Sequence, residues 1–342
     1  MTAHLTLIAD HVENPANTRT LCHAAAMFNA ACALYGAACP DETPAVPSIV
    51  REELAAYRPL VACDNSPGAA ELYGYRLPAG SRPAIVVGNE RRGVSPEVRR
   101  LTTAVVEIPM VSRRVNTLNV AAAGAVVLYY LSRPPGSRLQ RRASPDRRRP
   151  ELLLLGAADH VELGSAIRSA GALGWRSLFV EDRAGVWFGA SHAVQTEGRA
   201  AARRAKNPIK LVPAAATQRY GFEEVVVITT GTHGTPLHHA HLAGGDRQLV
   251  VIPDESSVNG ELEDWERLGR HVRLVRLDLP TTAFVYHYRL LATITLAEVA
   301  RQVGQRLTAP GGGRGGLRYA SELTVTGVLP GETVFLDELS GY

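Results

Sequence analysis

The sequence predicts an α/β fold made of two consecutive units, each with its own parallel sheet. Short apolar segments typical of buried strands alternate with segments of helical periodicity, and this alternation is typical of a parallel sheet with helices on both faces. The alternation stops at a stretch rich in Pro, Ser and Arg and then begins again, which indicates an internal repeat. A chain of 342 residues is long enough to bury two substantial cores.

The first unit is predicted to cover residues 1–133. Its expected strands are His4–Ile8, Cys32–Tyr35, Leu60–Cys63, Ala84–Val87 and Val105–Ile108. Its expected helices are Asn17–Asn29, Ile49–Tyr57, Pro96–Leu101 and Leu118–Leu131. In the first of these helices Leu21, Ala25 and Phe28 fall on one face, as packing against a core requires.

The second unit is predicted to cover residues 151–307. Its expected strands are Leu152–Leu155, Val225–Thr230, Gln248–Ile252 and Val272–Leu277, and its expected helices are Gly164–Leu173 and Tyr288–Val303. Residues 134–150 have no apolar face, which predicts a solvated linker between the units; an arm that grips RNA is the alternative. Residues 308–342 are predicted to be a Gly-rich C-terminal extension with a hairpin at Leu323–Phe335.

The charge of the chain is weakly positive. The formal net charge is +4, and Lys206 and Lys210 are the only lysines among 37 basic residues, a bias that indicates a GC-rich genome rather than a function. Such a surface permits RNA binding without requiring it. No segment resembles a signal peptide, and the longest apolar run, Val120–Leu131, is too short to span a bilayer. We therefore expect a cytoplasmic protein without membrane contact.

The cysteines predict a reduced protein rather than a metal site. All four fall in the first fifth of the chain, and none belongs to a C-x-x-C pair. Buried thiols in a cytosolic protein are the simplest interpretation. The four residues are Cys22, Cys32, Cys39 and Cys63.

Three segments between Arg82 and Arg133 carry the polar groups expected of a binding site. In V-V-G-N-E-R-R-G-V-S, Val87 ends a buried strand and Gly88 permits a sharp turn where a side chain would clash. Asn89 and Glu90 then place polar groups at the carboxyl end of the strand, where open α/β sheets bind ligands.

The other two segments are V-E-I-P-M and T-L-N-V-A-A-A-G. Pro109, which lies between Ile108 and Met110, ends the strand of the first of these segments. Thr117 is expected to cap a helix whose first turn carries Asn119 and whose next residues are small. Three converging strand ends would form a pocket lined by exposed backbone groups.

These three segments resemble the second and third signature motifs of the SPOUT superfamily, TrmH (SpoU) branch. The resemblance implies a trefoil-knotted α/β fold that binds S-adenosylmethionine, with the adenine held by the knot loops. Three ordinary strand-end turns of a Rossmann-like domain are the alternative interpretation. The residues implied in cofactor binding are Val87, Gly88, Asn89, Glu90, Ile108, Met110, Thr117, Leu118 and Asn119.

The first motif of the family resembles two segments of the chain. In the first unit Asn17 matches the family's asparagine, and His23 occupies the position of its catalytic arginine. In the second unit Arg168 matches that arginine and Glu162 replaces the asparagine, while P-D-E-S-S replaces the G-N-E segment. We therefore predict two tandem trefoil-knotted SPOUT-like domains packed as an intramolecular pseudo-dimer. The first would bind the cofactor, and the degenerate second would contribute Arg168; a surface arginine is the alternative.

The candidate catalytic residues are Arg168, His23, Asn17, Glu90 and Asn119. Methyl transfer to a hydroxyl needs alignment and removal of a proton. Arginine is a poor base, and the family's arginine is thought to act with a substrate phosphate. His23 titrates near neutrality and can take the proton, or it is simply a half-buried helix residue. Glu90 can orient a donor or face the sulfonium charge; otherwise it caps the following turn.

The resemblance implies a methyltransferase that uses S-adenosylmethionine to methylate ribose 2'-hydroxyls of tRNA or rRNA. O-methylation of a free nucleoside or other small metabolite is one alternative, favoured by the lost symmetry and by the absence of an N-terminal RNA-binding extension. A non-catalytic RNA-binding relic is the other. The expected partner is RNA or a small nucleoside-like substrate, and the pseudo-dimer would allow a monomeric protein.

Overall fold

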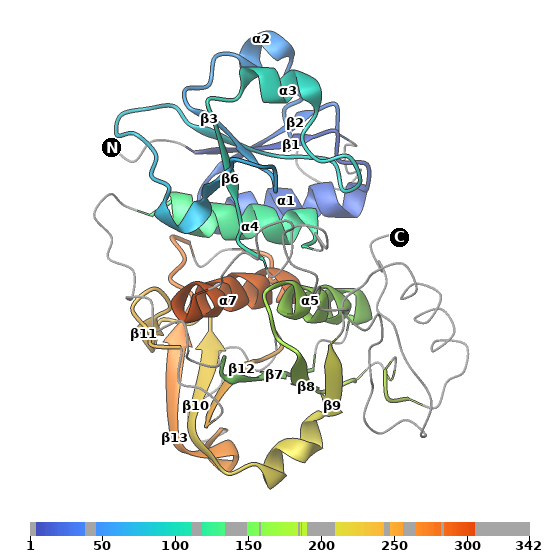
Figure 1. The fold of residues 1–342 in the computed structure, drawn as a ribbon, viewed down its shortest axis with the longest axis vertical. Coiled ribbons are helices and arrows are strands. Elements are labelled where there is room, and N and C mark those ends of the chain that lie inside the picture. Colours follow the sequence, from blue (N-terminus) through green and yellow to red (C-terminus); the bar gives the residue numbers. More distant parts are fainter. Residues whose placement is uncertain are drawn as a thin grey trace, which may run out of the picture.

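The described part of the protein contains two parallel sheets with four long helices between them (Figure 1). The computed structural model describes residues 5–37, 46–110, 118–133, 149–156, 159–183, 185, 187–189, 209–242, 247–255, 265–281 and 284–304. The predicted linker, apart from its last two residues, and the C-terminal extension at 308–342 lie outside this description.

The first sheet has the strand order β2-β1-β5-β3-β6-β4, and every pairing in it is parallel. Its strands are β1 (Thr6–Asp10), β2 (Ala31–Tyr35), β3 (Leu60–Cys63), β4 (Ala70–Glu71), β5 (Ala84–Val87) and β6 (Ala104–Glu107). The central strands β1 and β5 are buried along their whole length, because helices cover both faces of the sheet. Alternate residues therefore enter different cores: Ile85 packs toward α1 and α4, and Val86 toward α2 and α3.

The helices of the first half begin at well-defined caps. The helices of this half are α1 (Pro15–Met27), α2 (Arg51–Leu54), the short 3-10 helix η1 (Leu72–Gly74), α3 (Pro96–Leu101) and α4 (Val120–Leu131). Asn14 caps α1 and Ser95 caps α3, and each is followed by a proline, whose fixed φ and missing N–H suit the first helical position. In α4 only Ala123 among the twelve residues is not buried, because the helix lies between the first sheet and the second half.

The second sheet has the order β11-β13-β10-β12-β7-β8-β9, again with parallel pairings throughout. Its strands are β7 (Glu151–Leu154), β8 (Ser177–Val180), β9 (Lys210–Pro213), β10 (Phe222–Thr229), β11 (Thr235–Pro236), β12 (Gln248–Ile252) and β13 (Gly269–Arg276). Its helical elements are α5 (His160–Ala172), η2 (Ala214–Arg219), η4 (Glu266–Leu268) and α7 (Tyr288–Val303).

The two halves share one strand order. The series β2-β1-β5-β3-β6-β4 corresponds, place by place, to β8-β7-β12-β10-β13-β11, and β9 is an addition beyond β8. The corresponding strands also occur in the same order along the chain. Each first strand is followed by a long helix, α1 or α5, and each sixth strand by another, α4 or α7.

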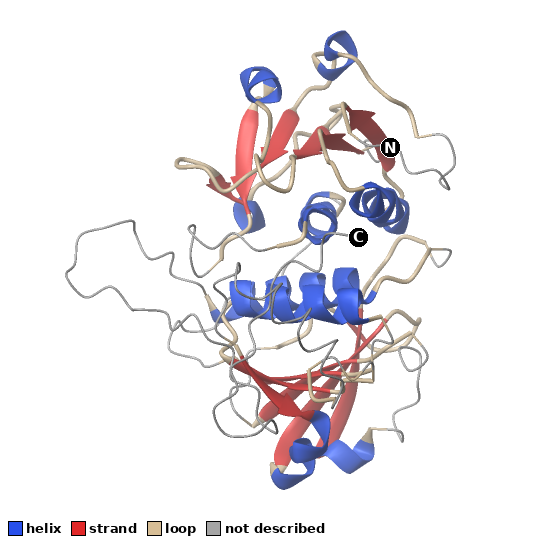
Figure 2. Cartoon of the chain, turned by 90° about the vertical axis from the view of Figure 1, so that its right-hand side faces the viewer, coloured by secondary structure: helices blue, strands red, loops and turns tan. Residues whose placement is uncertain are grey.

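The long helices of the two halves form the layer between the sheets. Figure 2 shows a helix of the second half running across the view while helices of the first half are seen nearly end-on, so the two pairs cross. Every residue of α7 is buried, and Glu298, Arg301 and Gln302 near its end are joined by hydrogen bonds. Glu298 accepts hydrogen bonds from Tyr130, at 2.5 Å, from Arg301, at 2.6 and 2.8 Å, and from Gln302, at 2.9 Å. This buried network joins α4 to α7.

Most predicted elements are confirmed, several at their predicted bounds. The strands Leu60–Cys63, Ala84–Val87 and Gln248–Ile252 and the helices Pro96–Leu101 and Tyr288–Val303 agree with the structure. The helix predicted at 49–57 is only the four residues of α2, and the strands β8 and β9 were not predicted. The two-residue strands β4 and β11 were not predicted either. No helix among the described residues has the length and apolar character needed to cross a membrane.

The start of α4 corrects one prediction. Asn119, not Thr117, is the N-cap, because its Oδ1 accepts hydrogen bonds from the backbone N–H groups of Ala121 and Ala122, at 2.9 and 3.4 Å. Thr117 itself lies outside the described residues. The helix therefore begins two residues later than predicted, and Asn119 is held at its first turn.

Candidate functional site

The turn after β5 is closed by its own backbone. Asn89 and Gly93 exchange two backbone hydrogen bonds, of 3.0 and 2.9 Å. A Cβ on Gly88 would lie 2.2 Å from the carbonyl carbon of Gly93 and 2.3 Å from the backbone nitrogen of Val94. Glycine at position 88 is therefore required by the close approach of two backbone segments, as the sequence predicted. The preceding Val87 is buried and ends the strand.

Asn89 holds this turn against the end of β1. Its Oδ1 accepts hydrogen bonds from the backbone of Arg91 and Arg92, at 2.9 and 3.0 Å. Its Nδ2 donates to the carbonyl oxygen of His11, at 2.7 Å. The side chain is 4% exposed and its amide is used on both sides. The capping role that the sequence offered as an alternative for Glu90 is thus performed by Asn89.

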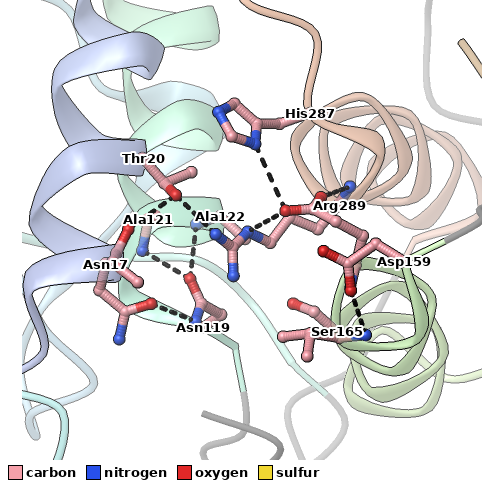
Figure 3. Close-up of polar contacts among 12 residues, drawn as sticks. Asn17, Thr20, Asn119, Ala121, Ala122, Asp159, Ser165, His287 and Arg289 are labelled. Carbon is pink, nitrogen blue, oxygen red and sulfur yellow. Dashed lines mark hydrogen bonds and ion pairs between the residues drawn. The ribbon is translucent and has the colours of Figure 1, made fainter. Parts of the chain in front are cut away.

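Glu90, Asn17 and Asn119 form a continuous hydrogen-bonded group, which we call the amide–carboxylate group. Nδ2 of Asn17 donates to Oε1 of Glu90 at 2.8 Å, and Nδ2 of Asn119 donates to Oδ1 of Asn17 at 2.9 Å. The backbone N–H of Glu13 donates to Oε2 of Glu90, at 3.2 Å. Figure 3 shows Asn17 and Asn119 facing each other beside the first turn of α4.

The orientation of each amide in this group follows from its partners. The Oδ1 of Asn119 caps α4, so its Nδ2 must face Asn17. Asn17 then accepts with its oxygen and donates to the carboxylate of Glu90. Both amides are buried, at 2% and 4% exposure, and such groups are costly to leave unpaired. Three predicted site residues are therefore brought together, through hydrogen bonds between residues 73 and 102 positions apart.

The remaining predicted cofactor residues contribute mainly packing. Ile108 and Met110 follow β6, and each side chain is 3% exposed within the hydrophobic core. Leu118 packs partly buried against the same core. A ligand at this edge of the sheet would consequently meet the backbone of residues 108–110 rather than these side chains.

A second polar group crosses from α1 to the second half. Asn17, Thr20 and His23 lie at intervals of three residues, so they line one face of α1. Nη2 of Arg289, on α7, donates to Oγ1 of Thr20 at 2.5 Å (Figure 3). The arginine side chain is 8% exposed, and its Nε lies 3.0 Å from Oε1 of Glu162 on α5. The guanidinium is therefore held in place from both halves.

His23 points toward the second half as well. Its Nδ1 lies 2.8 Å from Nε2 of His287, and Nδ1 of His287 lies 3.3 Å from Oε1 of Glu162. Burial lowers the pKa of His23, and the neighbouring His287 and Arg19 lower it further. Burial alone would raise the pKa of Glu162, but its hydrogen bond from His287 and the charge of Arg289 outweigh burial and lower it.

The sequence anticipated only some of these residues. Arg168 is half-buried on α5, and its catalytic role stays a prediction. Sequence reasoning missed Thr20, His287 and Arg289 as members of the junction. The available signal was the pair of polar residues His287 and Arg289 at the start of the predicted helix Tyr288–Val303. No local sequence pattern indicates that Thr20 and His23 of α1 are their partners.

Comparison with known proteins connects the first half to one family. Residues 49–129 match the model of the SpoU rRNA Methylase family. A protein of Archaeoglobus fulgidus described as an uncharacterized tRNA/rRNA methyltransferase is 46% identical over 68 residues. That alignment covers 19% of this chain and 30% of the relative, so the chain spans less than a third of the curated protein it matches.

Two solved methyltransferase structures match a larger share of the chain. The SpoU methyltransferase AviRb from Streptomyces viridochromogenes, in complex with AdoMet, is 22% identical with a TM-score of 0.34, over 39% of this chain and 58% of that one. The AdoMet-bound rRNA methyltransferase from Sinorhizobium meliloti is 22% identical with a TM-score of 0.34, over 38% and 56%. At these scores the structural likeness carries no argument about function.

Proposed function

We propose that this chain, which matches the SpoU rRNA Methylase family over residues 49–129, is an S-adenosylmethionine-dependent RNA methyltransferase with one active site. The observation that carries the proposal is the amide–carboxylate group of Asn17, Glu90 and Asn119. It lies at the carboxyl ends of parallel strands, where open α/β sheets bind ligands, and two of its three members belong to the matched segment.

The residues at this edge fit a sulfonium cofactor. The carboxylate of Glu90 supplies negative charge beside a positively charged ligand, and its orientation is held by Asn17 and the backbone of Glu13. The turn from Val87 to Glu90, the segment 108–110 and residues 117–119 would hold the cofactor, mainly through backbone groups. When bound, S-adenosylmethionine supplies an electrophilic methyl group. The chain would then position the acceptor hydroxyl in line and remove its proton.

We further propose that the methyl group is transferred to ribose 2'-hydroxyls of tRNA or rRNA. His23 is the candidate base, because its lowered pKa keeps the imidazole neutral at neutral pH. Arg168 would act on the substrate side from the second half. Arg289 supports a shared site, because it carries a buried positive charge from the second half to α1.

The second half is proposed to be a degenerate copy of the first, so that one chain is an intramolecular pseudo-dimer of two trefoil-knotted domains. The shared strand order supports this interpretation, as does the helix layer between the sheets. In the copy, Glu162 and His287 stand at the helix positions of Asn17 and Asn119, which removes the amide pair. We therefore expect one cofactor per chain, in the first half.

Calorimetric titration of the full chain with S-adenosylmethionine tests the single site. We expect one bound cofactor per chain, and two equivalent sites would contradict the degenerate copy. Asn119→Ala should weaken this binding, because Asn17 loses the partner that fixes its amide. An exposed control, His239→Ala, should not alter the affinity, since it lies on the second half away from the amide–carboxylate group.

Methyl transfer from labelled cofactor to bulk RNA and, separately, to a nucleoside mixture identifies the substrate class. Label in RNA at the ribose 2'-oxygen supports the proposal, whereas label only in nucleosides supports the small-substrate alternative, which the asymmetry of the two halves favours. RNA affinity should fall steeply with salt if linker arginines contact phosphates. Arg147 and Arg148 are the residues to replace with Ser, because Arg149 donates a hydrogen bond to the carbonyl of Leu173 and faces the ring of Trp175.

A further inference from the structure

Three ionisable side chains, from α1, from α5 and from the cap position of α7, form one line across the junction of the two halves. Nδ1 of His23 on α1 lies 2.8 Å from Nε2 of His287, the residue before α7. Nδ1 of His287 lies 3.3 Å from Oε1 of Glu162 on α5. The two imidazole rings are stacked, with centroids 5.1 Å apart and planes inclined by 24°. The line therefore runs from the first half into the second without a gap.

The hydrogen-bonding capacity of these groups fixes the positions of the protons. An ionised carboxylate only accepts hydrogen bonds, so His287 must carry a proton on Nδ1, facing Glu162. In neutral His287 the other nitrogen, Nε2, is then an acceptor. Nδ1 of His23 must consequently donate to it. Neutral His23 is left with its lone pair on Nε2, the nitrogen that faces away from His287.

We propose that Glu162 and His287 are positioning residues that prepare Nε2 of His23 as the proton acceptor of the methyl transfer, an inference that rests on the proposed function. His23 shares a helix face with Asn17, and six residues of α helix separate them by about 9 Å. A nucleotide bound at the amide–carboxylate group can span that distance. The second half would then act in the chemistry through His23 while holding no cofactor of its own.

The proposed step is balanced within the site. The substrate hydroxyl oxygen forms a bond to the methyl carbon, and the carbon–sulfur bond breaks with its electron pair on sulfur. The hydroxyl proton passes to Nε2 of His23, and the proton on Nδ1 of His23 passes to Nε2 of His287. The positive charge thus moves onto His287, beside the carboxylate of Glu162, and the extra proton is later released to water.

The surrounding charges agree with this assignment. The charged groups nearest the two rings are Arg19 on α1, Arg289 on α7 and Glu162 on α5. The positive charge of Arg19 disfavours a permanent charge on His23, which therefore stays neutral until the reaction. Arg289 is paired with Glu162 and with Thr20. These contacts hold the carboxylate of Glu162 in place beside Nδ1 of His287.

Nitrogen NMR of histidine-labelled protein tests the assignment without any reaction. We expect the proton of neutral His23 on Nδ1 and that of His287 also on Nδ1. His287→Phe keeps a stacked ring but removes both nitrogens, so His23 should move toward the Nε2–H form. Glu162→Gln, in which the side chain can also donate, should release the tautomer of His287. A wild-type His23 protonated on Nε2 would overturn the proposal.

The pH–rate profile provides the second readout. The acidic limb of kcat/KM should follow the pKa of His23 that NMR titration measures, in the wild type and in His287→Phe alike. In His287→Phe we expect kcat to fall about 10-fold or more at an unchanged affinity for S-adenosylmethionine. This is less than the roughly 10²- to 10⁴-fold that general acid–base catalysis contributes, because His23 itself remains. Unchanged tautomers together with an unchanged profile in this variant would overturn the inference.

A matched control uses a pair of histidines that both belong to the second half. His238 and His239 have ring centroids 4.1 Å apart, and His239 is exposed, so His239→Phe should leave the profile unchanged. The proposed function can fail separately. If the tautomers are as expected but the wild type neither binds cofactor nor methylates RNA or nucleosides, the methyltransferase function is wrong, and the base role of His23 is wrong with it.

Discussion

The same two helix positions carry different chemistry in the two halves. Asn17 is the third residue of α1 and Asn119 the cap of α4, and their amides are joined by a hydrogen bond of 2.9 Å. The corresponding residues are Glu162, the third residue of α5, and His287, the cap position of α7; Oε1 of Glu162 and Nδ1 of His287 are 3.3 Å apart. A neutral amide pair in one half is thus matched by a carboxylate and an imidazole in the other.

This difference shows how one helix start can be satisfied in two ways. Asn119 caps α4 with its own side chain. His287 provides no side-chain cap for α7; instead Oε2 of Glu162 accepts the backbone N–H of Arg289, at 2.9 Å. The carboxylate also suits the positive end of the helix dipole. Glu162, which stands at the position of Asn17 in the proposed ligand-binding group, therefore stabilises the start of α7 instead.

The turns after β5 and β12 differ in the same sense. The first contains Gly88, whose neighbours leave no room for a Cβ, and Asn89, which pairs with backbone on both sides. The second contains Pro253, and Asp254, which forms an ion pair of 2.5 Å with Arg183. A tight turn with a neutral amide has been replaced by a charged pair. The comparison supports the proposal that the ligand-binding edge lies in the first half.

The largest effect is expected from Arg168→Ala, which tests whether the second half acts on the substrate. We expect turnover to fall by at least about 100-fold at nearly unchanged cofactor affinity, because the group removed would act only on the substrate side. Single-turnover methylation and calorimetry measure the two quantities. Arg270→Ala, an exposed arginine of the same half, is the control. Wild-type turnover in Arg168→Ala would reduce the second half to a scaffold.

Glu162→Ala should cause the largest loss of stability. It leaves the buried guanidinium of Arg289 without its carboxylate and α7 without its cap, and breaking a buried ion pair costs about 3–5 kcal/mol. Urea unfolding measures the loss. Asn17→Ala, the change at the matching position, should cost less, about 1–3 kcal/mol, since the group removed is a neutral amide and Glu90 keeps its hydrogen bond from the backbone of Glu13. Equal losses would contradict the difference drawn between the halves.

Asn119→Ala should cost about 1–2 kcal/mol in thermal or urea unfolding, because the cap of α4 is lost. Asn119→Asp separates the two roles of this residue. The carboxylate still caps α4 but cannot donate to Asn17, so stability should largely recover while cofactor affinity stays low. Full recovery of affinity in Asn119→Asp would show that the amide pair is not needed for binding.

The smallest effect concerns pH. The pKa of His23 is lower in the folded protein than its ordinary value near 6.5, so the unfolded chain binds the proton more readily. The corresponding stability is complete above pH 6.5 and is lost as pH falls through 6.5 toward the folded pKa. We expect less than about 1 kcal/mol, because the ring is only half-buried. Urea midpoints measured from pH 7.5 to 5 should show a shallower fall in His23→Gln.

Much of the fold could be predicted because its signals are local. The strand Ala84–Val87 is a continuous apolar run, Gly88 marks the turn, and Ser95 with Pro96 marks a helix start, so few other conformations satisfy these segments. The assignment of Thr117 as a cap was wrong, because Thr117 and Asn119 are both suitable cap residues and only one of them occupies the position. The choice of Asn119 depended on its second hydrogen bond, to Asn17.

By itself, the sequence determined that there are two parallel sheets and that polar groups such as Asn89, Glu90 and Asn119 follow the strands of the first. Only the tertiary structure decided which of them meet, and that Arg289 and His287 reach α1. These contacts join residues 264 and 269 positions apart. Their geometry depends on the way two helix pairs pack and cross. No local periodicity encodes this packing, since a helix face is equally apolar whichever partner covers it.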